Sequence, residues 1–174
     1  MLVDPGSYVY TPSVVWRNRF RSVAMHNTFY IEDVEPVVFN ERCLFSLNLA
    51  ERSCDALPWK VEHTLYSIPA SRTISFDKSS RITLEDAWHD VPGNRFTSCW
   101  NFTLAPEIKP VLIENMWHFF YKDVCVVTMQ SNDLTFAVED SWYAPGYGQK
   151  VSCKRLIAKT DLTTQPVKII FTRK

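Results

Sequence analysis

The sequence predicts an all-β protein, a single antiparallel β-barrel of about ten strands with hairpin (meander) connections. Three features of its 174 residues indicate this class. Runs rich in β-branched and aromatic side chains fit a pleated, half-buried surface, turn residues recur about every eight to twelve positions, and no stretch keeps the apolar period of a helix. A β-sandwich is the alternative. The chain is expected to form one domain, residues 1–174, with a short N-terminal arm over about residues 1–12.

The best-defined stretch is a predicted three-stranded meander in the second half of the chain. Its strands are residues 111–121, 124–130 and 134–143. The pair Lys122-Asp123 separates the first two strands, and the triplet Ser131-Asn132-Asp133 separates the last two. Asn and Asp turn a chain because they tolerate left-handed backbone conformations. Such short connections allow only antiparallel neighbours, because a parallel return needs a crossover of about a dozen residues.

Further strands are predicted on either side of the meander, bounded by Pro, Gly, Asn, Asp or Ser. Residues 42–49, for example, alternate large apolar side chains with polar or smaller ones, the pattern of a half-buried strand. The predicted strands before the meander are residues 28–33, 42–49, 59–67, 71–76, 81–89 and 95–104, and those after it are residues 151–159 and 166–172.

Arg17, Arg19 and Arg21 alternate with other residues near the N-terminus, close to two aromatic side chains. Arginines interleaved with aromatics stack on bases and grip phosphates in proteins that bind nucleic acid. The alternative is a solvated strand face, with the three arginines on one side and Trp16 and Phe20 on the other. Lys+Arg and Asp+Glu balance at 19 each, which favours the strand, so no nucleic-acid partner is expected.

A short phrase occurs three times: an apolar residue, Glu, Asp or Asn, any residue, Trp, and then His or Tyr. Its copies are residues 84–89, 113–118 and 138–143. On a strand, the apolar residue, the Asp or Asn and the Trp share one face, and the Glu and the His or Tyr share the other. In one interpretation Trp marks the buried face and Glu the solvated face. In the other, one of these faces lines a common pocket.

The pocket interpretation supplies the candidate site residues. A carboxyl group in an apolar cavity becomes a weaker acid and acts as a general acid or base, here beside a histidine. The candidate catalytic residues are Glu114, His118, Glu85 and His89. The candidate ligand-binding residues are Trp88, Trp117, Trp142 and Tyr143. In the other interpretation the glutamates are ordinary solvated residues.

The residue counts argue against several kinds of site and partner. The four glycines form no phosphate-binding pattern, and the four His and five Cys form no zinc motif, so neither a cofactor nor a metal is expected. The apolar runs are too short to span a bilayer. The first residues lack the basic and apolar regions of a signal peptide, which favours an intracellular protein, while a removed leader would make it secreted. No feature of the sequence specifies an oligomeric state.

The length, the strand number, the late meander and the high aromatic content together resemble the lipocalin-like (calycin) β-barrels across most of the chain. Trp16 also stands where those proteins carry a Gly-x-Trp pattern, although the Gly is replaced by Val14. The resemblance implies a barrel that encloses one small apolar ligand.

Three functions are compatible with these features. The leading one is binding of a small, mostly apolar or aromatic molecule in a hydrophobic pocket inside the β-barrel. The second is an isomerase, cyclase or lyase that acts in the same cavity through a Glu/His acid-base pair. The third is a β-sandwich module for protein–protein interaction, anchored by exposed aromatics. A closed apolar cavity favours the first two functions, and a filled core with exposed Trp favours the third.

Overall fold

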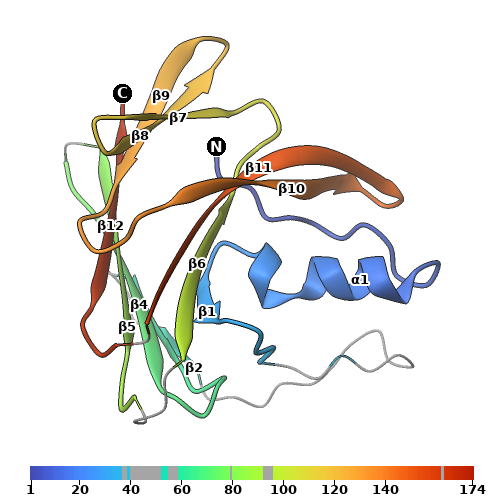
Figure 1. Ribbon diagram of the computed structural model, residues 1–174, viewed down its shortest axis with the longest axis horizontal. Coiled ribbons are helices and arrows are strands. Elements are labelled where there is room, and N and C mark those ends of the chain that lie inside the picture. Colours follow the sequence, from blue (N-terminus) through green and yellow to red (C-terminus); the bar gives the residue numbers. More distant parts are fainter. Residues whose placement is uncertain (37–38, 40–51, 55–58, 79, 92–95, 162) are drawn as a thin grey trace.

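The computed structural model describes residues 1–36, 39, 52–54, 59–78, 80–91, 96–161 and 163–174. These residues form two antiparallel β-sheets that face each other, with a short helix beside the smaller sheet (Figure 1). The expected all-β class is therefore confirmed.

The smaller sheet has four strands in the order β1-β6-β11-β10. Their bounds are β1 (Phe29–Ile31), β6 (Thr97–Thr103), β11 (Gln149–Asp161) and β10 (Ala137–Gly146). Strand β6 pairs with residues 155–161 of β11, so the hairpin end of β10 and β11 extends beyond β6. In Figure 1 this hairpin end reaches over the helix.

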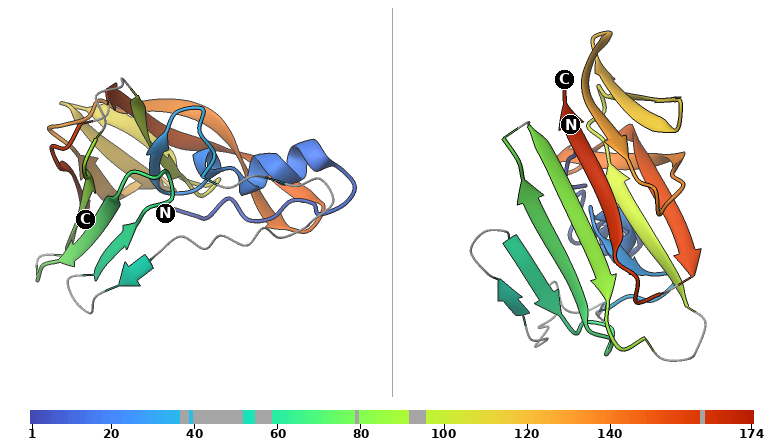
Figure 2. Two further views of the ribbon diagram at one scale, coloured as in Figure 1. Left: turned by 90° about the horizontal axis from the view of Figure 1, so that it is seen from below. Right: turned by 90° about the vertical axis from the view of Figure 1, so that its left-hand side faces the viewer.

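The larger sheet has eight strands in the order β2-β3-β4-β5-β12-β9-β8-β7. Their bounds are β2 (Arg52–Cys54), β3 (Trp59–His63), β4 (Ala70–Phe76), β5 (Arg81–Trp88), β12 (Val167–Arg173), β9 (Val124–Gln130), β8 (Met116–Tyr121) and β7 (Lys109–Ile113). Figure 2, on its right, shows this sheet with β12 (dark red) inserted beside β5 (light green). The last strand of the chain thus joins the two halves of the sheet.

Apolar side chains from both sheets fill the space between them. Phe29, Trp100 and Leu156 of the smaller sheet belong to one buried cluster with Ile169 and Phe119 of the larger sheet. Close packing of two facing sheets is the architecture of a β-sandwich. Because the described strands form two separate sheets and no closed ring, the expected β-barrel is wrong, and the sandwich alternative fits.

The segment with alternating arginines is a helix, α1 (Val14–Arg21), and not the expected strand. Its N-cap is Ser13, whose Oγ accepts a hydrogen bond from the backbone N of Trp16 at 3.4 Å. Trp16 and Phe20 are four residues apart, so they lie on one helical face as well as on one strand face. The alternation alone therefore does not distinguish a helix from a strand. The N-cap at Ser13 favours the helix.

Residues 111–121 form two strands where one was expected. Glu114 and Asn115 connect β7 to β8, with φ of 48° and 63°. Lys122 and Asp123 connect β8 to β9 in the same way, with φ of 46° and 64°. Two consecutive left-handed residues are the signature of the tight hairpin turn whose twist matches that of the strands. The second copy of the repeated phrase therefore crosses a turn.

The predicted strand 134–143 also differs, because it does not pair with β9. It becomes β10 in the smaller sheet, and β12 takes the place beside β9. The other predicted strands coincide with β1, β3, β4, β5, β6, β11 and β12, while predicted strand 42–49 lies outside the described residues. No described helix is long and apolar enough to cross a membrane.

Candidate functional site

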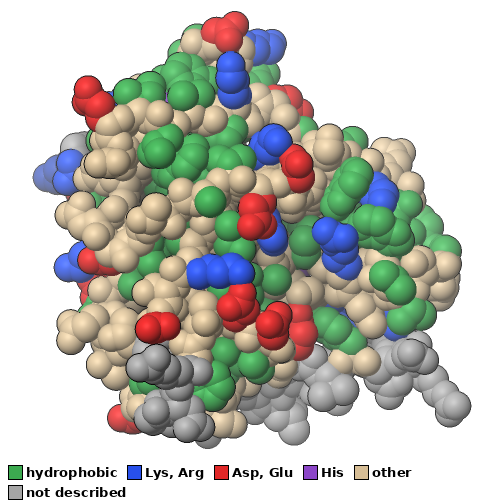
Figure 3. Space-filling model, in the orientation of Figure 1, with side chains coloured by type: hydrophobic (Ala, Val, Ile, Leu, Met, Phe, Trp, Pro, Cys, Tyr) green, Lys and Arg blue, Asp and Glu red, His purple; other side chains and the backbone are tan. Residues whose placement is uncertain are grey.

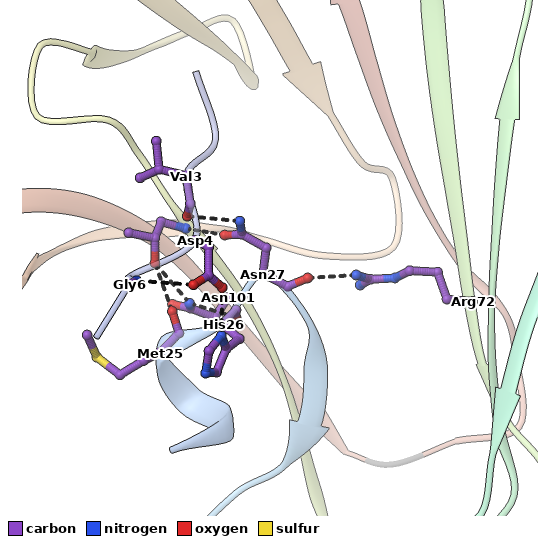
Figure 4. Close-up of polar contacts among 9 residues, drawn as sticks. Val3, Asp4, Gly6, Met25, His26, Asn27, Arg72 and Asn101 are labelled. Carbon is purple, nitrogen blue, oxygen red and sulfur yellow. Dashed lines mark hydrogen bonds and ion pairs between the residues drawn. The ribbon is translucent and has the colours of Figure 1, made fainter. Parts of the chain in front are cut away.

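The most distinctive polar cluster lies where the N-terminal segment meets the turn before β1 (Figure 4). His26 Nδ1 is 2.8 Å from Asp4 Oδ1, and both side chains remain partly exposed, at 39% and 68%. A carboxylate only accepts hydrogen bonds, so this contact requires a proton on Nδ1. In the neutral imidazole the lone pair then belongs to Nε2, the nitrogen turned away from Asp4.

The backbone around Asp4 is fixed by Gly6. The backbone N of Gly6 donates to Asp4 Oδ2 at 3.1 Å. Gly6 has φ of +75°, and a Cβ at this position would lie 2.5 Å from the carbonyl oxygen of Ala144. Only glycine fits both constraints without a shift of the backbone. The Asp-Pro-Gly turn therefore holds the carboxylate of Asp4 toward the histidine.

The position of His26 is fixed through its backbone. It follows the short 3₁₀ helix η1 (Val23–Met25), and its carbonyl oxygen accepts bonds from the backbone N of Thr28 at 2.9 Å and from Asn101 Nδ2 at 3.0 Å. Asn101 belongs to β6 and is fully buried, and its Oδ1 has no hydrogen-bond partner among the described residues. The cluster is thus attached to the centre of the smaller sheet.

Asn27 joins the N-terminal segment to the same sheet. Its Nδ2 donates to the carbonyl of Val3 at 3.0 Å, and its Oδ1 accepts from the backbone N of Thr103 at 2.7 Å. Its own carbonyl accepts from Arg72 Nη1 of the larger sheet at 2.8 Å. One asparagine thereby links three segments that are far apart in the sequence, which orients the neighbouring His26.

A buried ion pair positions the arginine that binds Asn27. Arg72 of β4 donates through Nε and Nη2 to the two oxygens of Asp86 on β5, at 2.6 and 2.7 Å. Trp100 Nε1 of the smaller sheet donates to Asp86 Oδ2 at 2.9 Å. A carboxylate with three charge-assisted or aromatic N–H donors is well satisfied despite its burial. The pair therefore connects the core of both sheets to the candidate site.

A pocket of about 300 Å³ lies beside η1, over the outer face of the smaller sheet. Tyr30 and Lys159 line it, and Cys99 is the buried neighbour of Tyr30 on β6. Burial raises the pKa of both the Tyr30 phenol and the Cys99 thiol. The hydrogen bond to Glu32 raises the pKa of the Lys159 ammonium. These groups keep their protons at neutral pH, so none of them is a ready general base.

The arrangement of Asp4 and His26 suits proton transfer. A carboxylate that holds one nitrogen of an imidazole fixes the tautomer and stabilises the protonated ring, while the other nitrogen exchanges a proton with a substrate. The pair also provides two donors of the kind that bind metals. No third His, Cys, Asp or Glu within the described ranges joins them in a metal-binding group.

The candidate catalytic residues from the repeated phrase are not brought together. Glu114 is exposed at the tip of the β7–β8 hairpin, and His118 Nδ1 is 3.7 Å from Cys125 Sγ. Glu85 is 3.3 Å from the ammonium of Lys168, and His89 Nε2 is 2.9 Å from Ser71 Oγ. Strands β12 and β9 separate β5 from β8, which places the two Glu/His sets about 14 Å apart at the usual strand spacing.

The candidate ligand-binding residues occupy three different environments. Trp88 is 2% exposed in the core, where its Nε1 donates to Ser98 Oγ at 2.9 Å. Trp117 is half-buried and lines a pocket of about 380 Å³ beside Asn115. Trp142 and Tyr143 are half-buried on β10, and Trp142 contacts the helix α1. The three tryptophans of the repeated phrase thus lie in the core, at the β8 pocket and against α1.

Sequence reasoning did not single out Asp4 or His26. The two residues are 22 positions apart, and their contact depends on β6 side chains that come much later in the chain. The Asp-Pro-Gly turn is the one local signal that marks Asp4.

Comparison with known families gives one extensive match. The family model described as Heparinase II/III-like, C-terminal, matches residues 1–172. No curated protein shows a significant match to the chain.

Solved structures share the fold. Heparan sulfate lyase HepC from Pedobacter heparinus is 14% identical, with a TM-score of 0.77 over 98% of this chain and 28% of its own. The heparinase III BT4657 gene product is 13% identical, with a TM-score of 0.70 over 98% of this chain and 27% of its own. A heparinase III crystal structure is 14% identical, with a TM-score of 0.72 over the same shares. The chain thus spans less than a third of each structure.

These findings correct three expectations from the sequence. The lipocalin resemblance is wrong, because the described strands form an open sandwich and the similar structures are lyases. The small apolar ligand and its hydrophobic barrel pocket are wrong for the same reason, since both required a closed barrel around a cavity. The chain belongs to the Heparinase II/III-like C-terminal family.

Proposed function

We propose that this chain is the β-sandwich part of a lyase that acts on an acidic, uronate-containing polysaccharide. The proposal is supported by the family match over residues 1–172 and by the shared fold with a heparan sulfate lyase. It retains one of the functions expected from the sequence, a lyase that acts by acid-base chemistry. It replaces the expected small apolar ligand by a polysaccharide. Because the matching part is 28% of HepC, the proposal assigns this domain one proton-transfer group and not a complete active site.

A lyase cleaves the glycosidic bond of a uronate by elimination. A base removes the proton from the carbon next to the carboxylate, and the electron pair forms a carbon–carbon double bond. The neighbouring carbon–oxygen bond breaks, and the leaving oxygen takes up a proton. Such proton transfers require a positioned group that titrates near neutral pH, and histidine is the side chain used most often.

The contact between His26 and Asp4 is the observation that carries this proposal. It leaves Nε2 as the lone-pair nitrogen on a partly exposed ring, where it is able to accept the proton. Asp4 accepts the hydrogen bond of Nδ1 and so keeps the ring in the tautomer that has its lone pair on Nε2. Asn27 and Asn101 act as positioning residues, because they hold the backbone on both sides of the ring.

Turnover of the protein at its natural full length tests this assignment. Product formation is followed by the ultraviolet absorbance of the unsaturated uronate. His26→Gln is expected to lower the rate at least about a hundredfold, the usual contribution of a general base. Asp4→Asn is expected to lower it less, because it weakens the contact that fixes the tautomer but leaves the ring in place. Asp161→Asn, an exposed carboxylate at the end of β11, is the control and keeps the parental rate.

The repeated phrase provides the competing result. If Glu114→Gln or His118→Gln abolishes product formation while His26→Gln leaves it intact, the proton-transfer site lies on the β7–β8 hairpin. That outcome would overturn the assignment to His26 and Asp4.

A further inference from the structure

A second cluster lies at the end of the molecule formed by α1 and the β10–β11 hairpin. The ammonium of Lys150 is 3.1 Å from the ring centroid of Trp16, 4.4 Å from that of Trp142 and 5.4 Å from that of Tyr8. Trp16 stands at 88° to Trp142 and at 85° to Tyr8, with centroids 6.0 and 5.8 Å apart. The rings therefore form an aromatic cage around the cation, in which ring quadrupoles attract the charge.

The cage holds Lys150 without cancelling its charge. Three other cations of β11 each have a carboxylate partner: Lys154 with Asp140 at 2.6 Å, Arg155 with Glu139 at 2.6 Å, and Lys159 with Glu32. No carboxylate within the described part of the chain pairs with Lys150 or with Arg19, whose guanidinium lies 5.3 Å from the Trp16 centroid. Neutral rings attract the ammonium but do not neutralise its formal charge.

The helix α1 adds further positive charge to this end of the molecule. Residues 14–21 contain Arg17, Arg19 and Arg21 and no acidic residue. The whole chain has a formal net charge of zero, against which this helix is basic, although Arg17 is only 5% exposed. In Figure 3 green and blue side chains lie at the right-hand end of the visible face, while red ones lie at its middle, top and left. A local concentration of one sign attracts ligands of the other.

Exposed aromatic rings continue the cluster toward the hairpin tip. Tyr10 and Tyr147 stack with centroids 5.6 Å apart and an interplanar angle of 23°, and they are 47% and 57% exposed. Contiguous apolar surface that stays exposed in a folded protein marks an interaction site, and these two rings form one continuous stacked pair. The C–H faces of a pyranose ring pack on such rings, while sulfate and carboxylate groups bind the neighbouring cations.

We propose that Tyr10, Tyr147, Arg19 and Lys150 form a binding surface for a sulfated, uronate-type polysaccharide chain. It is distinct from the Asp4–His26 pair and rests on the proposed function for the choice of ligand. Only three residues separate Asp4 from Tyr8 of the cage, a distance of at most about 14 Å along the backbone. One extended polysaccharide is able to contact both places, with its non-reacting units on the aromatic and cationic surface.

Affinity measurements with the purified protein test the surface. The probes are heparin fragments of defined length, and neutral dextran of the same length is the reference. The double variant Arg19→Gln/Lys150→Met is expected to bind heparin at least about tenfold more weakly and with a smaller salt dependence, because two charge-assisted contacts are lost. Met retains the packing inside the cage. Tyr147→Ser, an exposed position, is expected to weaken binding without lowering the thermal midpoint.

The matched control is Lys154→Gln, which removes one paired cation from the same strand. Its heparin affinity is expected to stay within about twofold of the parent, since Asp140 already pairs with this cation. Equal affinities for the double variant and this control would overturn the proposal. So would heparin binding no stronger than dextran binding.

The two proposals fail separately. His26→Gln is expected to retain heparin affinity and lose product formation. If no uronate polysaccharide is cleaved while heparin affinity still depends on Arg19 and Lys150, the surface stands and the lyase assignment fails. If polysaccharide is cleaved and the double variant binds heparin normally, the lyase assignment stands and the surface fails.

Discussion

Arg72 donates two hydrogen bonds to Asp86 across neighbouring strands. Among the described residues, Asp86 is the only charged partner of the Arg72 guanidinium. The side chain of Asp86 is fully buried, and that of Arg72 is 17% exposed. A buried charge without its partner is costly because the interior solvates it poorly. The pair therefore makes the fold sensitive to either residue.

Asp86→Ala is accordingly expected to lower the free energy of unfolding by about 3–5 kcal/mol, because Arg72 and Trp100 lose their acceptor together. Urea unfolding followed by tryptophan fluorescence measures the change. The control is Glu85→Gln on the same strand, whose pair with Lys168 is exposed and whose loss costs less than about 1 kcal/mol. Similar midpoints for the two variants would contradict the role of the buried pair.

Gly6→Ala is expected to destabilise the protein more than Gly148→Ala. Both glycines have positive φ, +75° and +72°, so each substitution costs about 1–2 kcal/mol from the left-handed backbone alone. A Cβ at Gly6 additionally meets the oxygen of Ala144, whereas a Cβ at Gly148 meets nothing within 4 Å. Thermal unfolding of the two variants side by side isolates the contact. A lower midpoint for Gly148→Ala would refute it.

Trp88→Ala is expected to cost about 3–5 kcal/mol, the usual range for removing a large aromatic side chain from a core. Trp88 is 2% exposed, whereas Trp117 is half-buried at the edge of a pocket. Trp117→Ala is therefore expected to cost distinctly less. Urea midpoints at constant m-value compare the two, and equal losses would mean that Trp117 is also a core residue.

Stability is expected to fall at alkaline pH through Tyr30. Burial raises the pKa of its phenol, and the nearby Cys99 thiol raises it further. Above about pH 10 the unfolded chain loses this proton while the native state keeps it, so the free energy of unfolding decreases as pH rises. Below that pH the contribution is fully present and constant.

Tyr30→Phe removes this titration, so its urea midpoint is expected to decline less steeply between about pH 9 and pH 11 than that of the parent. Tyr121→Phe, at an exposed position on β8, serves as the control and keeps the parental slope. An unchanged slope in Tyr30→Phe would show that other groups cause the alkaline loss.

Most strands were predictable because the alternation of apolar and polar side chains on a half-buried sheet can be seen within the sequence of each strand. Strands β3, β5 and β6 fall within predicted ranges for this reason. The helix α1 was missed, since its eight residues are too few to display a helical period and start with two β-branched residues. The turn at Glu114 and Asn115 was missed because its two polar residues fitted a repeated phrase that suggested a continuous strand.

The arrangement of strands into two sheets was not predictable from local pattern. Ser131 to Asp133 has turn chemistry, but it carries the chain from one sheet to the other, and only the pairing of β9 with β12 decides this. The same holds for the candidate site. His26 faces Asp4 because Asn27 and Asn101 form hydrogen bonds that span 76 and 75 positions, from the segment before β1 to β6.

The first eight residues are attached to the sandwich by backbone hydrogen bonds at Val3, Pro5 and Tyr8, to Thr103, Ala144 and Gly148. Each bond spans at least 100 positions, so this segment can dock only after β6, β10 and β11 are in place. Asp4 travels with it. Its contact with His26 therefore forms only once the N-terminal segment has docked on strands that lie at least 100 positions later in the chain.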